Sequence, residues 1–240
     1  MDMPTDSTQP PAATAGTSHV APPPVIVRRL PGLSDYLATW EAMREFTAQR
    51  GPASPDELWL LEHPPVYTQG LNGKAIHLLS AGGIPVVQTD RGGQITYHGP
   101  GQLVAYLLVD LARAGLGIRD VVSGFENSVI RLVARQGIEA VARCDAPGVY
   151  VAGAKLASIG MRVRRGCTYH GLALNVQNDL APFSGINPCG YPGLETTSLH
   201  NLGAPIDLVQ VGDELAAILL EVLGLFAAGP AAGPAAGPRH

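Results

Sequence analysis

The chain has 240 residues, of which 46% are hydrophobic and 15% are charged, and its formal net charge is −4. This length and apolar content suffice for one sizeable core and exclude two ordinary domains with tails. The slightly acidic balance excludes a strongly basic surface, so we expect no nucleic-acid partner.

Both ends of the chain have compositions typical of disordered tails. Residues 1–24 are rich in Pro, Ala, Thr and Ser and lack the basic and apolar regions of a secretory signal. Residues 227–240 repeat Ala-Ala-Gly-Pro, in which each proline prevents a continuing helix. We therefore expect one folded domain spanning residues 25–226.

No segment has the length and apolarity of a membrane span. The longest apolar stretch, Leu215 to Ala228, is interrupted by Glu221 and is shorter than the roughly 20 residues that a span requires. Three cysteines without Cys-x-x-Cys spacing favour neither a disulfide framework nor a zinc site. We expect a soluble, cytoplasmic protein with no membrane association.

The elements inside the domain are predicted from apolar spacing, with helical periodicity for helices and short Gly- or Pro-bounded runs for strands. Ser34 is the expected cap of the first helix, Asp207 caps the third, and Gly224 ends it. In chain order the predicted elements are strand 25–29, helix 35–49, strands 58–62, 86–89 and 103–109, helix 118–136, strands 148–151, 156–163 and 172–176, and helix 208–223. Because helices and strands do not alternate one for one, we predict an α+β single domain with a mixed β-sheet and packed helices.

Three loops contain more glycine and polar residues than a core requires. The loop from Arg91 to Gln102 holds five glycines and prolines, which permit tight turns and close approach of a ligand to the backbone. Its glycine spacing is neither a dinucleotide-binding fingerprint nor a P-loop. A hairpin turn with a capping arginine explains it as well as a binding loop does.

The second and third loops hold a lysine and a cysteine. Lys155 is either a strand-start residue that reaches solvent or an ammonium held near a reacting group. Cys189 lies between Pro188 and Gly190, with no neighbouring apolar run, which favours a functional thiol. Cys144 and Cys167 are interpreted as buried small hydrophobes.

The tetrapeptide Thr96–Gly99 recurs as Thr168–Gly171. The repetition is either a coincidence of strand-end chemistry or the mark of two edges of one pocket. A zinc site built from His98 and His170 is disfavoured, because neither histidine has a second ligand at metal-binding spacing.

Together these loops resemble the octanoyl-acyl-carrier-protein:protein N-octanoyltransferases of lipoate biosynthesis. The resemblance covers the whole folded unit in the family's order. The stretches that carry it are LLEHPPVYTQG (60–70), RGGQITYHGPGQL (91–103), GAKLASIGMRV (153–163), YHGLALNV (169–176) and NPCGYPGLETTSL (187–199).

The resemblance implies a fold similar to the catalytic domain of biotin and lipoate ligases. It also implies an acyl-enzyme on Cys189 and a Lys155 that acidifies that thiol. The implied acyl pocket consists of Arg91, Gly92, Gly93, Gln94, Ile95, Thr96, Tyr97, His98, Ser158, Ile159, Gly160, Gly171, Leu172 and Ala173.

The implied reaction, catalysed by a monomer, moves an octanoyl or lipoyl group from acyl carrier protein to a lysine of lipoyl domains. The acceptors are the E2 subunits of 2-oxoacid dehydrogenases and the glycine cleavage H protein. Because a thioester is already activated, we expect no ATP and no metal, and the phosphopantetheine arrives on the donor. Arg162, Arg164 and Arg165 are either a solvated face or a docking patch for an acidic partner.

Three other functions compete with this prediction. An ATP-dependent lipoate or biotin ligase would use the same fold, but the chain lacks an adenylate-type glycine/arginine loop. A non-catalytic carrier-protein or lipid-binding module would not need the cysteine and the lysine. A cysteine hydrolase would need a base for water, for which His98 or His170 could serve.

Overall fold

The computed structural model describes residues 24–228. The predicted tails therefore lie outside the described residues except at their inner ends. There Ala227 forms a bridge with Val25, and the N–H of Ala228 donates to the carbonyl of Val25 at 2.8 Å. These two contacts join Ala227 and Ala228, just past Phe226, to the start of the first strand.

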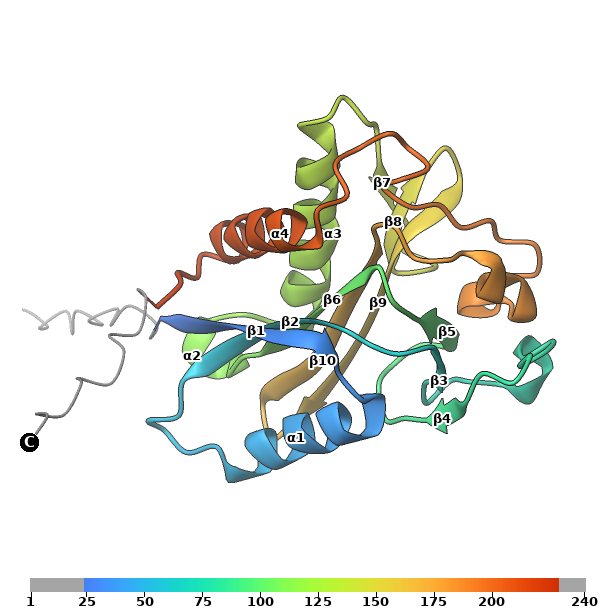
Figure 1. Cartoon of the computed structure of the whole chain (residues 1–240). Coiled ribbons are helices and arrows are strands. Elements are labelled where there is room, and N and C mark those ends of the chain that lie inside the picture. The colour runs from blue at the N-terminus through green and yellow to red at the C-terminus, as the bar shows by residue number, and fades with distance from the viewer. Residues whose placement is uncertain (1–23, 229–240) are drawn as a thin grey trace, which may run out of the picture.

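A seven-stranded mixed sheet forms the centre of the domain (Figure 1). Only its first pair of strands, β1 and β2, is parallel, and the other neighbours are antiparallel. In spatial order the strands are β1 (Val25–Leu33), β2 (Asp56–Glu62), β6 (Gln102–Leu108), β10 (Cys167–Asn175), β9 (Ala154–Arg164), β8 (Gly148–Val151) and β7 (Val141–Ala142).

A second, three-stranded sheet lies beside the first and carries one wall of the site. Its order is β4 (Val86–Gln88), β3 (Val66–Gln69) and β5 (Ile95–His98). A small core of Tyr67, Tyr97 and Phe183 packs this sheet against the 3₁₀ segment η2 (Ala181–Gly185). Two further 3₁₀ segments are η1 (Ala75–His77) and η3 (Pro188–Gly190).

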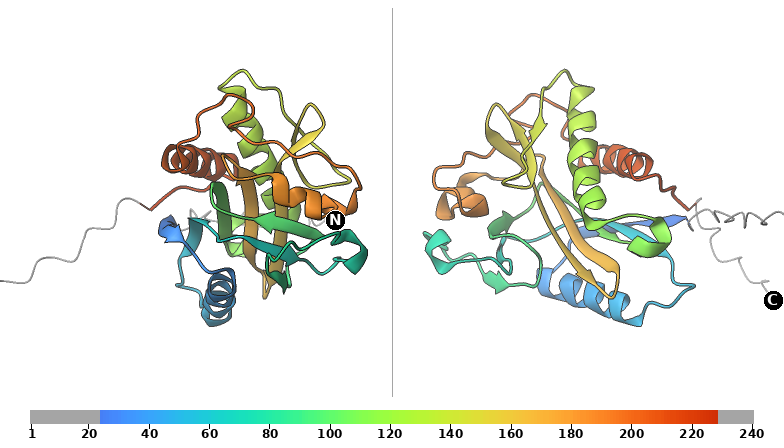
Figure 2. Two further views of the ribbon diagram at one scale, coloured as in Figure 1. Left: turned by 45° about the vertical axis from the view of Figure 1, so that its right-hand side comes forward. Right: turned by 180° about the vertical axis from the view of Figure 1, so that it is seen from behind.

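Helices cover both faces of the main sheet (Figures 1 and 2). On one face α3 (Ile118–Ala134) and α4 (Leu208–Val222) bury their apolar stripes, including Phe125 and Leu215, against the sheet. On the other face α1 (Tyr36–Gln49) packs Met43 against Trp59 and Tyr106. The short α2 (Leu111–Ala114) follows β6. No helix within residues 24–228 combines the length and apolarity needed to cross a membrane.

This architecture confirms the predicted α+β fold with a mixed sheet and packed helices. All three predicted helices and all seven predicted strands are present, with ends that shift by a few residues, whereas β3, β5, β7 and α2 were not predicted. The cap of α1 is Asp35, whose carboxylate accepts from the N–H of Ala38, so the prediction of Ser34 was wrong by one residue. Asp207 caps α4 as predicted, and Gly224 follows that helix at φ 65°.

Candidate active site

Cys189 lies at the centre of η3 with an unusual backbone. Its φ of 55° and ψ of 14° fall in the left-handed region, which residues with a side chain seldom adopt. Gly190 follows at φ 80°, and the N–H of Gly190 closes the turn onto the carbonyl of Asn187 at 2.9 Å. The turn presents the sulfur, which is half-buried, toward β9 instead of into a core.

Lys155 lies at the start of β9 and is 1% exposed. Its Nζ contacts the Sγ of Cys189 at 2.8 Å, the phenol oxygen of Tyr150 at 3.0 Å and the carbonyl of Pro147 at 3.1 Å. An ammonium has three protons to donate, so these three acceptors account for all of them. The phenol of Tyr150 itself donates to the carbonyl of Ala146, which leaves its oxygen free to accept.

This buried lysine has no carboxylate partner. Within the part of the chain that the structure describes, no carboxylate lies within salt-bridge distance of Lys155. A buried ammonium is costly unless it is paired and hydrogen-bonded. The Pro147 carbonyl is neutral and the Tyr150 phenol keeps its proton in the bond to Ala146, so Cys189 is the ionisable partner that remains.

Local structure holds the lysine rigidly in place. The N–H of Lys155 donates to the carbonyl of Glu195, and its carbonyl accepts from the N–H of Thr197, so the chain after the cysteine turn lies alongside β9. Gly148 leaves room for the side chain: its φ is 143°, and a Cβ there would lie 2.9 Å from Nζ. Sequence spacing could not indicate this close approach.

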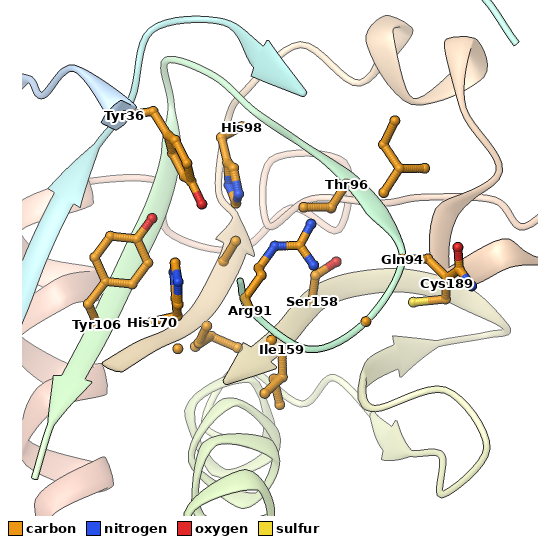
Figure 3. A pocket seen from close by; sticks show the side chains of 16 residues that line it. Tyr36, Arg91, Gln94, Thr96, His98, Tyr106, Ser158, Ile159, His170 and Cys189 are labelled. Carbon is orange, nitrogen blue, oxygen red and sulfur yellow. The ribbon is translucent and has the colours of Figure 1, made fainter. Parts of the chain in front are cut away.

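A pocket extends from Cys189 into the protein between the two sheets (Figure 3). Its lining confirms that Thr96–Gly99 and Thr168–Gly171 are two edges of one pocket, because His98 and His170 both contribute to it. Twelve of the predicted pocket residues line it, namely Arg91, Gly93, Gln94, Ile95, Thr96, His98, Ser158, Ile159, Gly160, Gly171, Leu172 and Ala173.

Two predicted pocket residues lie elsewhere. Gly92 lines an outer groove on the other side of the cysteine. Tyr97 faces the opposite side of β5, where its ring packs 5.6 Å from Tyr67 and 5.5 Å from Phe183. Successive strand side chains alternate between faces, so Thr96 and His98 turn toward the pocket and Tyr97 turns away. Tyr97 therefore does not line this pocket.

The outer groove begins where the pocket ends. The two cavities share Gly93, Gln94, Ile159, Gly160 and Cys189, which places the sulfur where they meet. The groove's own lining includes Ile118 and Val122 of α3, Met161 of β9 and the loop from Asp145 to Pro147. A thioester could thus lie across the sulfur with its acyl chain inward and its thiol part outward.

Arg91 supports the wall of the pocket. Its guanidinium is buried and donates to the hydroxyl of Thr68 at 2.8 Å, to the carbonyl of the same residue, and to the carbonyl of Gly92 at 2.9 Å. Burial lowers the pKa of Arg91. A Cβ on Gly160 would lie 3.1 Å from the Cδ of this arginine, so the glycine lets β9 pass close to it.

Neither candidate histidine contacts the sulfur of Cys189. His98 is paired through both ring nitrogens, with the carbonyl oxygen of the Gln102 side chain at 2.8 Å and with the Thr68 hydroxyl at 3.3 Å. His170 is paired through Nε2 with Asp90 at 3.1 Å. Burial lowers the pKa of both histidines, and Figure 3 places both rings at the end of the pocket away from Cys189.

Asp90 holds three side chains in place at the inner end of the pocket, which is the end away from Cys189. Its carboxylate accepts hydrogen bonds from His170, Tyr169 and Trp40. Burial opposes its ionisation, but these three donors outweigh that effect and hold the pKa of the carboxyl well below its usual range. The ionised Asp90 therefore fixes the Nε2–H tautomer of His170.

Three pocket residues were not predicted as binding residues, namely Tyr36, Tyr106 and His170. In the sequence, Tyr36 has the helical spacing of a core residue and Tyr106 has the pattern of an ordinary strand residue. Cys144 is exposed, contrary to prediction, whereas Cys167 is buried as predicted. No cluster of three metal-ligating side chains occurs among residues 24–228.

The three arginines proposed as a docking patch lie along the far half of β9 and the turn that follows it. Arg164 is nine residues from Lys155 on the same strand, which corresponds to about 30 Å at 3.3 Å per residue. Arg165 donates to the carbonyl of Ala48 at the end of α1. The placement favours a solvated face that is remote from the sulfur.

The fold and this site define a catalytic domain of the lipoyl protein ligase A/B class, and the family profile "Lipoyl protein ligase A/B catalytic domain" matches residues 35–219. Two solved structures of similar fold, each with a TM-score of 0.68, are a putative lipoate protein ligase from T. acidophilum, 14% identical, and a lipoate-protein ligase A bound with ATP, 15% identical. Each alignment covers 87% of this chain and 88% of the other.

Curated relatives show which family within this class the chain is most similar to. An octanoyltransferase of Alkalilimnicola ehrlichii is 58% identical over 83% of this chain and 93% of its own length. An octanoyltransferase of Pseudomonas entomophila is 61% identical over 80% of this chain and 89% of its own length. The chain belongs to the octanoyltransferase family.

Proposed function

We propose that this protein transfers an octanoyl or lipoyl group from the thioester of acyl carrier protein to a lysine of lipoyl domains, as the first step of endogenous lipoate synthesis. The acceptors would be the E2 subunits of 2-oxoacid dehydrogenases and the glycine cleavage H protein. The observation that carries the proposal is the 2.8 Å contact between Lys155 and Cys189 at the mouth of the acyl pocket.

In the first half-reaction the Cys189 thiolate attacks the carbonyl carbon of the donor thioester. A carbon–sulfur bond to Cys189 forms, and the bond to the pantetheine sulfur breaks. The departing thiolate takes a proton from Lys155, which becomes a neutral amine. This transfer also removes the buried positive charge at the step in which the sulfur loses its negative charge.

In the second half-reaction the neutral amine of Lys155 is a general base. The acceptor lysine enters as a free amine and attacks the acyl-cysteine, and its proton passes to Lys155. The new amide forms as the carbon–sulfur bond of Cys189 breaks, which restores the thiolate and the ammonium. Proton and charge therefore return to their starting places after each turnover.

This cycle requires neither ATP nor a metal, because the donor thioester supplies the activation and brings its own phosphopantetheine. A monomer suffices, since one chain supplies Lys155, Cys189 and the pocket. A reducing compartment such as the cytoplasm would keep the thiol free. A hydrolase that uses a histidine as its base gains no support, because Lys155 contacts the sulfur and neither histidine does.

The test is a transfer assay with octanoyl-carrier protein and a lipoyl domain, without ATP. We expect octanoyl amide on the acceptor lysine and no free octanoate beyond the rate of the uncatalysed thioester. A requirement for ATP with free octanoic acid would identify a ligase instead. Free octanoate formed at the same rate with and without the acceptor would identify a hydrolase.

A further inference from the structure

The end of the acyl pocket farthest from Cys189 is polar (Figure 3). Tyr36, Tyr106 and His170 line it, and ring contacts through His63 join them into one cluster. The ring centroids of Tyr36 and His63 are 5.1 Å apart, those of His63 and Tyr106 5.8 Å, and those of Tyr106 and His170 5.9 Å. A site for a plain alkyl chain would be expected to end in apolar side chains.

Two polar atoms at this end have no hydrogen-bond partner among the described residues. They are the hydroxyl of Tyr36, which is 3% exposed, and Nδ1 of His170, which is 1% exposed. Thr68, Thr89 and Arg91 lie near the Tyr36 hydroxyl. Buried polar atoms normally find a partner in the protein or in an ordered water.

The two atoms complement a hydroxyl group. Because Nε2 of His170 donates to Asp90, Nδ1 carries the lone pair and accepts. The phenol of Tyr36 can donate. A hydroxyl group can accept from the phenol and donate to Nδ1, whereas a methyl group can do neither.

We propose that the inner end of the pocket is a hydrogen-bonding subsite for a hydroxyl group and that it limits the length of the acyl chain. With an octanoyl chain bound, the subsite holds a water molecule. A longer alkyl chain displaces that water and leaves both polar atoms unpaired, while a chain that ends in a hydroxyl replaces it. The inference rests on the proposed acyl transfer and adds its specificity.

The test compares two thioesters with the same number of chain atoms, ω-hydroxyoctanoyl and nonanoyl. The kcat/KM ratio of the hydroxylated chain to the alkyl chain is measured for the wild type and for Tyr36→Phe. We expect the ratio to fall about tenfold in the variant, equivalent to about 1.4 kcal/mol. The decanoyl-to-octanoyl ratio should rise by about the same factor, because Phe leaves no hydroxyl to desolvate.

A second variant and a matched control complete the experiment. His170→Asn should shift both ratios in the same directions, and asparagine tolerates the φ of 63° at this position. Tyr67→Phe also removes a buried tyrosine hydroxyl, which donates to Pro182 outside the pocket, so it should change neither ratio. Ratios in Tyr36→Phe and His170→Asn that equal those of the wild type would overturn the subsite. Equal rates for octanoyl and decanoyl in the wild type would do the same, whereas no transfer of any chain would refute the proposed function instead.

Discussion

At the level of single residues, the proposed transfer reaction depends on the partners of one buried side chain, the amine of Lys155. Lys155 has three acceptors, and one of them is the Cys189 sulfur. In the proposed function this pair provides both the nucleophile and the acid. Each of the two residues should be indispensable for a different reason.

Removing the sulfur should remove the covalent step. Cys189→Ser leaves a hydroxyl that the neighbouring ammonium does not ionise, so we expect kcat to fall by about 10³-fold or more. The rate of octanoyl amide formation measures this loss. Cys144→Ser, which alters an exposed cysteine outside both cavities, should keep wild-type activity. A Cys189→Ser enzyme with more than a tenth of wild-type activity would contradict the assignment.

Removing the amine should impair both half-reactions while the sulfur remains. For Lys155→Met we expect kcat/KM to fall by about 10²- to 10⁴-fold, the usual range for lost acid–base catalysis. Alkylation of Cys189 by iodoacetamide at neutral pH should slow as well, because less thiolate forms without the ammonium. Lys74→Met, at an exposed lysine, is the matched control. Alkylation at an unchanged rate in Lys155→Met would show that the lysine does not ionise the sulfur.

At the scale of elements, the site depends on close approach between strands. Gly148 on β8 has φ 143°, and a Cβ there would lie 2.4 Å from the carbonyl oxygen of Ala157 as well as close to Lys155. The pairing of β8 with β9 thus fixes the lysine only if this position is glycine.

Gly148→Ala should both destabilise the fold and lower activity. We expect the free energy of unfolding to fall by about 1–3 kcal/mol, as for other overpacked core positions, with transfer reduced at least tenfold. Urea denaturation and the transfer assay measure the two effects. Gly51→Ala places its Cβ in open space and should change neither. A fully active and stable Gly148→Ala would mean that β8 does not constrain Lys155.

The sequence predicts long, strongly apolar elements well and short polar ones poorly. The helix predicted for 208–223 and strand 148–151 match α4 and β8 because packing alone determines them. The four-residue strands β3 and β5 carry polar residues such as Thr68 and His98, whose burial is balanced by hydrogen bonds to distant parts of the chain. No local pattern encodes such partners.

The candidate site also has a part that the sequence predicts and a part that it does not. Glycine-rich loops marked most pocket residues, and the family resemblance joined Lys155 to Cys189 across 34 residues. Tyr36 and Tyr106 have the pattern of core residues, and only the fold reveals that their hydroxyls lie at the inner end of the pocket. Tyr97 is the opposite case: it belongs to a glycine-rich loop that predicts binding residues, but its side chain lies in the small core. Side chains alternate between the two faces of β5, and Tyr97 is on the core face.

At the scale of the whole molecule, buried histidines link stability to pH. Burial lowers the pKa of His63 to about 4, from an ordinary value of 6.5, and burial lowers the pKa of His98 and His170 as well. Between these values the unfolded chain binds more protons than the folded protein. Stability is therefore fully present above about pH 6.5 and is lost as the pH falls toward 4.

We expect the free energy of unfolding to decrease by about 2 kcal/mol from His63 alone between pH 7 and pH 5. Urea denaturation at the two pH values measures the decrease. His63→Asn should be less stable at pH 7 and should show a weaker dependence on pH. A wild-type midpoint that is equal or higher at pH 5 would contradict a neutral, buried His63.

The distribution of charge over the molecule bears on partner docking. Because Arg164 and Arg165 lie about 30 Å along β9 from Lys155, we expect their joint reversal to Glu to slow transfer from carrier protein and from octanoyl-pantetheine equally little. Initial rates with the two donors measure this. A transfer rate that falls only with the carrier protein would support the hypothesis that these arginines form a docking patch.

The central claim is a covalent octanoyl group on Cys189, formed and released beside Lys155. Intact-mass measurement and peptide mapping after mixing with octanoyl-carrier protein test it most directly. We expect one octanoyl adduct, mapped to Cys189, that disappears when a lipoyl domain is added and reappears as amide on its lysine. An adduct on Cys144 or Cys167, or an adduct on Cys189 that the lipoyl domain does not discharge, would contradict it.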